Sequence, residues 1–95
     1  MAVYIDVEPL DDHRYLVRIR EDAEEAEVRF QAGPAVLDEL DITGADEAQI
    51  VKETAAYLTR RQSVIDLPPM IDLYDVAAAY GEDYVQELRR RLRPL

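Results

Sequence analysis

The first third of the chain alternates apolar and polar residues with the two-residue period of half-buried β-strands. Three such runs follow one another, separated by short turn-like stretches at residues 9–12 and 21–24. Their apolar positions are Val3, Ile5, Val7, Tyr15, Val17, Ile19, Ala26, Val28 and Phe30. Because the connections are short, the pattern predicts a three-stranded antiparallel meander over residues 1–31. Arginines on the second run lie between acidic residues on its neighbours, which should fix the register.

After the strands, the period changes to that of amphipathic helices. A Gly-Pro pair predicts a short helix over residues 33–41, since proline suits the first helical position. Thr43 and Asp46 have the spacing of a capping box, and a long helix is predicted over residues 45–61. Its apolar stripe consists of Ile50, Val51, Thr54, Tyr57 and Leu58. We expect this stripe to lie on the apolar face of the sheet.

A pair of shorter helices is predicted over residues 72–92. Asp72 is a good N-cap for the first helix, and Gly81 can adopt the positive φ that often follows a helix end. The second helix begins with acidic residues and ends with arginines, as the helix dipole favours. The predicted fold class is therefore α+β, in which the meander is followed by three to four helices packed on one face. The whole chain, residues 1–95, is predicted to form a single domain.

An apolar segment with a Pro-Pro pair joins the long helix to this helix pair. Surface loops are normally polar, so its apolar residues must be covered by the core or by a partner, and the core is the commoner cover. Ile71 precedes the Asp72 cap and should pack inward near Val76, as in a hydrophobic staple. Local geometry does not force the residues beside the prolines inward, and tyrosine is common at interfaces. The candidate partner-binding residues are Leu67, Met70, Tyr74 and Tyr84.

Residues 54–92, TAAYLTRRQSVIDLPPMIDLYDVAAAYGEDYVQELRRRL, resemble the C-terminal segment of a group of short, uncharacterised prokaryotic proteins. The matching residues are Tyr57, Leu58, Arg60, Asp72, Leu73, Tyr80 and Tyr84. A weaker similarity covers the stretch VEPLDDHRYLV near the N-terminus. The chain departs from the group where Ile71 replaces a phenylalanine and where Gly81-Glu82 replaces Phe-Pro. The resemblance implies a helical architecture for this segment, and it implies no activity.

The charge distribution limits the classes of partner. The net charge is -10, and residues 1–59 contain fifteen acidic and five basic residues, whereas residues 60–95 contain six of each. A negative field over the front of the protein repels nucleic acid and favours basic partners or simple solubility. The opening MAVYIDVEPL lacks the features of a signal peptide, and no apolar run reaches membrane-spanning length. We therefore expect a soluble, cytoplasmic protein with no membrane association.

Patterns for catalysis or metal binding are weak. The chain has no cysteine, which excludes disulfides and cysteine-based metal sites. Asp11, Asp12 and His13 are adjacent in a turn and should point in different directions, so a solvated turn is favoured over a metal site. The acidic run at residues 21–25 lacks the spacing of a calcium-binding loop, and the lone histidine has no nucleophile pattern. We expect a non-enzymatic protein without a cofactor.

A helix-turn-helix nucleic-acid-binding motif is the alternative function. Its first half resembles the pattern of Val76, Ala77, Tyr80 and Gly81. Its DNA-facing residues would be Arg89, Arg90, Arg91 and Arg93. Glu87 stands where the motif expects an apolar residue, and Glu82 and Asp83 would repel phosphates. A solvated helix end matched to the helix dipole is the simpler interpretation of these arginines.

The preferred interpretation is a small acidic protein-interaction or regulatory module. Its expected partner is another protein or a second copy of itself in a homodimer, and nucleic acid is not expected as a partner.

Overall fold

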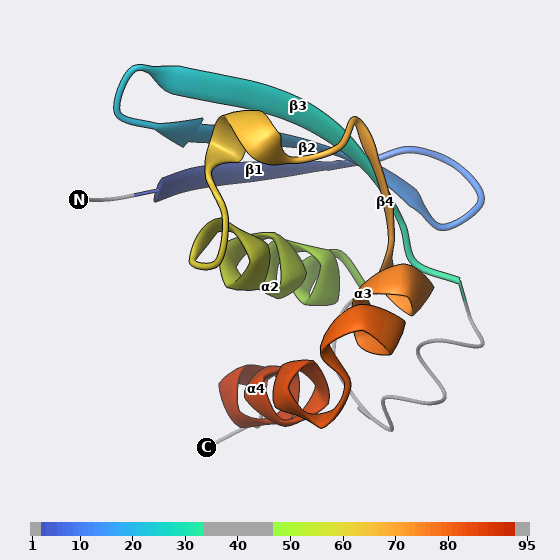
Figure 1. Cartoon of the computed structure of the whole chain (residues 1–95). Helices are drawn as coiled ribbons and strands as arrows, with labels where there is room; N and C mark the ends of the chain where they lie inside the picture. The colour runs from blue at the N-terminus through green and yellow to red at the C-terminus, as the bar shows by residue number, and fades with distance from the viewer. Residues whose placement is uncertain (1–2, 34–46, 93–95) are drawn as a thin grey trace.

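The antiparallel meander predicted from the alternating pattern is present. The computed structural model of the protein describes residues 3–33 and 47–92. Strands β1 (Val3–Pro9), β2 (Arg14–Glu21) and β3 (Glu24–Gln31) pair antiparallel in the order of the chain. The α+β class is confirmed (Figure 1). Beyond its first residue, the short helix predicted over 33–41 lies outside the described residues.

A fourth strand extends the sheet and was missed by the sequence pattern. Strand β4 (Met70–Asp72) pairs parallel with β3, so the sheet is mixed and has the order β1-β2-β3-β4. The prediction of three antiparallel strands was therefore incomplete. Three residues directly after two prolines are too few to show a strand period. Their partner strand also lies about forty residues earlier in the chain, where no local pattern connects the two.

The helices form two layers on one side of the sheet (Figure 1). Helix α2 (Glu47–Thr59) packs against β1 and β2, and helix α4 (Glu82–Leu92) packs on α2. Helix α3 (Leu73–Tyr80) follows β4 directly and contacts α4, while the short 3-10 helix η1 (Val64–Asp66) packs on β3. The described helices lie on a single side of the sheet, as predicted, although α4 packs mainly on α2 and not on the sheet itself.

The core fills the space between the inner face of the sheet and α2. All five residues of the predicted α2 stripe are buried, as are the inward-facing residues of β2 and the second half of β3. Thr54 is a buried polar residue of the core, and its hydroxyl donates to the Ile50 carbonyl at 2.8 Å and lies 2.7 Å from the Tyr84 hydroxyl. The opposite face of the sheet carries no helix from the described part of the chain (Figure 1).

Two predicted helix ends of the C-terminal pair are confirmed. The Asp72 carboxylate accepts a hydrogen bond from the Tyr74 backbone N–H at 2.9 Å, which caps α3. Gly81 has φ of 61°, and its N–H donates to the Ala77 carbonyl at 2.8 Å. A glycine is needed here because positive φ is strained for other residues. No helix in the described ranges is both long and apolar enough to cross a bilayer.

Candidate protein-interaction surface

Strand β4 divides the apolar Pro-Pro segment between two faces of the sheet. Ile71 is paired with Phe30 and is only 6% exposed, so it points into the core as predicted. Met70 is paired with Arg29 and lies on the open face, where it is 60% exposed. The alternation of a strand explains the difference, since successive side chains point to opposite faces. The segment is therefore neither wholly core nor wholly surface.

The four predicted partner-binding residues do not form one surface. Tyr74 is 57% exposed on the first turn of α3, whereas Leu67 is partly buried and packs against the core. Tyr84 is 0% exposed and lies between α4 and α2, so it cannot contact a partner in the folded protein. The apolar stripe of α4 faces α2, and this tertiary contact could not be assigned from the sequence. Of the predicted residues, Met70 and Tyr74 remain available.

The structure gathers a different set of residues around Met70. We call the residues Pro68, Pro69 and Met70 the Pro-Pro ridge. Met70 borders a hollow of about 540 Å³ on the open face of the sheet, the sheet hollow. The sheet hollow is lined by Leu10, Leu16, Glu27, Arg29, Pro69 and Met70. Met70 also borders a smaller hollow of about 190 Å³ beside α3, the helix hollow.

On the open face of the sheet, Arg18 is paired with acidic residues, whereas Arg29 has no ion pair from the described residues. Arg18 lies between Glu8 at 3.2 Å and Glu27 at 3.1 Å, and hydrogen bonds to Glu27 and then Glu8 raise the pKa of Arg18. These cross-strand pairs are those predicted from the sequence. Within residues 3–33 and 47–92, the guanidinium of Arg29 has no ion pair or hydrogen bond. Arg29, which lines the sheet hollow, is therefore available to a partner.

The helix hollow combines an apolar floor with an acidic rim. Leu58, Ile71 and Val76 contribute to the floor, and Asp72 and Asp75 lie at the rim. One carboxylate oxygen of Asp72 already accepts the hydrogen bond from the Tyr74 backbone N–H that caps α3. Neither carboxylate has an ion-pair partner among the residues that the structure describes. Among the described residues, the helix hollow therefore contains carboxylates without an ion-pair partner, and the sheet hollow contains Arg29, a cation without one.

The Asp11-Asp12-His13 turn is a structural link. His13 Nδ1 lies 2.9 Å from a Glu47 carboxylate oxygen, and the Tyr15 hydroxyl donates to the other oxygen at 2.7 Å. Arg14 pairs with Asp11 at 3.1 Å. In the part of the chain that is described, no group of three or more histidine, aspartate or glutamate side chains could hold a metal ion. Glu47 joins the start of α2 to the first hairpin, a contact that the sequence separation of 34 residues concealed.

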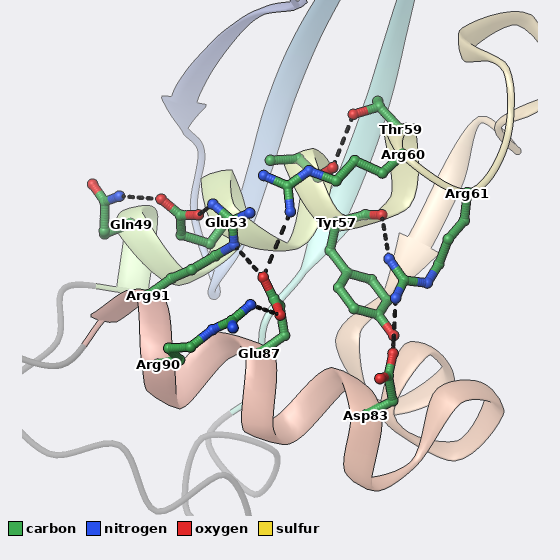
Figure 2. Close-up of polar contacts among 11 residues, drawn as sticks. Gln49, Glu53, Tyr57, Thr59, Arg60, Arg61, Asp83, Glu87, Arg90 and Arg91 are labelled. Atoms are coloured by element: carbon green, nitrogen blue, oxygen red, sulfur yellow. Dashed lines mark hydrogen bonds and ion pairs between the residues drawn. The ribbon is translucent and has the colours of Figure 1, made fainter.

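Arg90 and Arg91 of α4 are held by acidic residues of the same fold (Figure 2). The Glu87 carboxylate accepts hydrogen bonds from Arg90 and, at 2.7 Å, from Arg91. It also lies 3.5 Å from the guanidinium of Arg60, the residue that follows α2. Arg91 also reaches Glu53 of α2 at 3.4 Å. Glu87, the residue that breaks the helix-turn-helix pattern, is therefore the centre of an ion-pair network joining α2 to α4. Arg93 lies outside the described residues.

A tyrosine cluster holds the other end of α4 (Figure 2). The Tyr57 hydroxyl donates to Asp83, and the Arg61 guanidinium lies 3.6 Å from the Tyr57 ring centroid and 2.8 Å from Asp83. Burial raises the pKa of Tyr57 to about 12, and the hydrogen bond from Tyr57 lowers the pKa of Asp83. Both groups thus keep their usual charge states at neutral pH. The cluster stabilises the α2–α4 contact and presents no reactive group.

We expect the protein to show no significant binding to a mixed-sequence DNA duplex at physiological salt. The front of the chain is strongly acidic, and Arg90 and Arg91 are already neutralised by Glu87. Fluorescence anisotropy with a labelled duplex measures this directly. Glu87→Gln is the control, because it removes the carboxylate that pairs with Arg90 and Arg91 without adding a basic residue. Micromolar, salt-sensitive binding by the wild type that disappears when Arg89–Arg91 are changed to Glu would instead support the nucleic-acid-binding alternative.

The chain matches no protein-family model, no curated protein and no solved structure. The resemblance of residues 54–92 to short prokaryotic proteins therefore stays a prediction.

Proposed function

We propose that this chain is a small, non-enzymatic module that binds another protein through the Pro-Pro ridge. One observation carries the proposal. Met70, a large apolar side chain that is 60% exposed, borders the sheet hollow, where Arg29 has no ion-pair partner in the described part of the chain, and the helix hollow, where Asp75 has none. A concave apolar surface with a few polar groups is the arrangement that a partner can cover with favourable burial.

The residues of the ridge suit contact with a partner. Prolines are already restricted in the backbone, so an interface there requires little additional ordering. Methionine is flexible and polarizable, and it adapts to the shape of an opposing surface. Arg29 supplies a charge that a complementary carboxylate would satisfy once water is excluded. By contrast, Arg18 and Arg20 on the same face already have acidic partners in Glu27 and Glu25.

Met70→Asp should abolish capture of the partner from an extract of the cells that make this protein. A charge at the centre of a desolvated interface is costly, and we expect at least about a tenfold loss of captured partner. Immobilised wild-type and variant chains would be compared by quantitative mass spectrometry. Tyr4→Asp is the matched control, because Tyr4 is also a large exposed side chain on the open face but lies far from the ridge. Equal capture by wild type and Met70→Asp, or equal loss with both variants, would refute the proposal.

A further inference from the structure

Around the Pro-Pro ridge, the charges that have no ion pair from the described residues are arranged as a two-fold interface requires. In a two-fold dimer the same patch occurs on both copies, so the patch must be complementary to itself. Met70 is common to the sheet hollow, which contains Arg29, and to the helix hollow, which has Asp75 at its rim. One patch therefore contains a cation, a carboxylate of opposite sign and an exposed apolar side chain at the hollows' common border.

We infer that the partner of the ridge is a second copy of this chain, with Arg29 of each copy paired to Asp75 of the other. This inference rests on the proposed function and specifies its partner. A two-fold axis beside Met70 brings the sheet hollow of one copy against the helix hollow of the other. Both ion pairs then form at once, and the two Met70 side chains meet at the centre. Asp72 serves α3 as its cap, so Asp75 is the carboxylate left for the partner.

The sheet topology places Met70 on an outer strand. Strand β4 is last in the order β1-β2-β3-β4, so no neighbouring strand from the described residues covers its outer edge. Strand β4 has three residues and follows two prolines, and β1 presents Asp6 and Glu8 and ends at a proline. Short edge strands, charges and prolines discourage pairing with another strand. The dimer is therefore held by side chains of the ridge and its hollows and not by a sheet continued across the two copies.

The net charge of -10 opposes association of two copies, and local complementarity has to overcome it. At physiological ionic strength, charges separated by more than roughly 8 Å are largely screened, whereas the Arg29–Asp75 pairs lie in direct contact. A dimer of this kind is weak and concentration-dependent, because the ridge and its hollows form a small interface. We expect the purified full chain to be substantially dimeric at roughly 100 μM and to dissociate on dilution.

Charge reversal with rescue tests the pairing, measured by sedimentation velocity over a dilution series. Arg29→Asp and Asp75→Arg should each raise the dimer dissociation constant about tenfold or more, because every change occurs twice in a two-fold interface. The double variant restores opposite charges and should return to within roughly threefold of wild type, since both pairs re-form in reverse. Arg20→Asp is the control, because it changes the net charge as Arg29→Asp does but lies at the far end of the open face. Circular dichroism of each variant verifies that it is folded.

Each contrary outcome has a distinct meaning. A wild-type chain that stays monomeric up to roughly 500 μM overturns the dimer. So does a dimer that the single changes leave intact, because its interface then lies elsewhere, such as along β1. Failure of the double variant to recover would show that Arg29 and Asp75 do not pair with each other. In all three cases the proposed function survives if Met70→Asp still lowers capture of a partner from the extract. It is refuted, independently of the dimer, if Met70→Asp leaves capture unchanged.

Discussion

Ile71→Asp should unfold this protein, whereas the same change at the adjacent Met70 should leave it folded. Ile71 lies against Phe30 on the core face and is 6% exposed, so an aspartate there would bury a carboxylate without a partner. The cost is comparable to the whole stability of a small domain, which is about 5–15 kcal/mol. Met70 is 60% exposed, and a charge at that position remains in water. Thermal unfolding followed by circular dichroism measures both variants.

The comparison is well matched because both changes introduce the same side chain one residue apart in β4. Ile71→Asn is a useful third variant, since it is polar but uncharged and should be destabilised less than Ile71→Asp. If Met70→Asp also unfolds the chain, the ridge belongs to the core and cannot act as an interaction surface. If Ile71→Asp melts close to the wild-type temperature, the parallel pairing of β4 with β3 is incorrect.

Tyr84→Ala should destabilise the protein by about 3–5 kcal/mol, the range found when a large buried aromatic side chain is truncated. The Tyr84 ring is completely buried, and its centroid lies 5.3 Å from that of Tyr57 in an edge-to-face arrangement. Its removal would leave a cavity between α2 and α4 and break the contact with Thr54. Urea unfolding at neutral pH measures the change in free energy of unfolding.

Tyr84→Phe is the control, since it keeps the ring and removes the hydroxyl. Thr54 still donates to the Ile50 carbonyl, so no buried group is left unpaired and the loss should be about 1 kcal/mol. Burial raises the pKa of Tyr84 from the usual 10.0 to about 12, so ionisation favours the unfolded chain between these values. The free energy of unfolding of the wild type is therefore retained below pH 10 and falls as the pH rises towards 12. The free energy of unfolding of Tyr84→Phe should fall less steeply over the same range. Equal losses for the Ala and Phe variants would contradict this account of the core.

The elements that the sequence predicted correctly have local causes. The antiparallel meander follows from alternation and short turns, and the buried stripe of α2 follows from its helical period. The Asp72 cap and the positive φ at Gly81 depend on the chemistry of single residues. Strand β4 was missed because its three residues have no period of their own and because its hydrogen-bonding partner is distant in the chain.

The residues around the Pro-Pro ridge show where local patterns stop being informative. From the sequence, Leu67 and Met70 looked equivalent, and Tyr74 and Tyr84 both looked like interface residues. Parallel pairing of β4 then placed Met70 beside Arg29 on the open face, while Leu67 packed against the core. Packing of α4 on α2 buried Tyr84 completely.

The sequence by itself thus determined the α+β class, the strands of the meander, the inward stripe of α2 and the caps of α3. Only the tertiary structure decided that Arg29 lies beside Met70 without an ion pair from the described residues and that Glu87 pairs with Arg90 and Arg91 of α4. The physical reason is one of range. Backbone propensity and side-chain period act between near neighbours along the chain, whereas the placement of a charge depends on strand register and helix packing between distant segments.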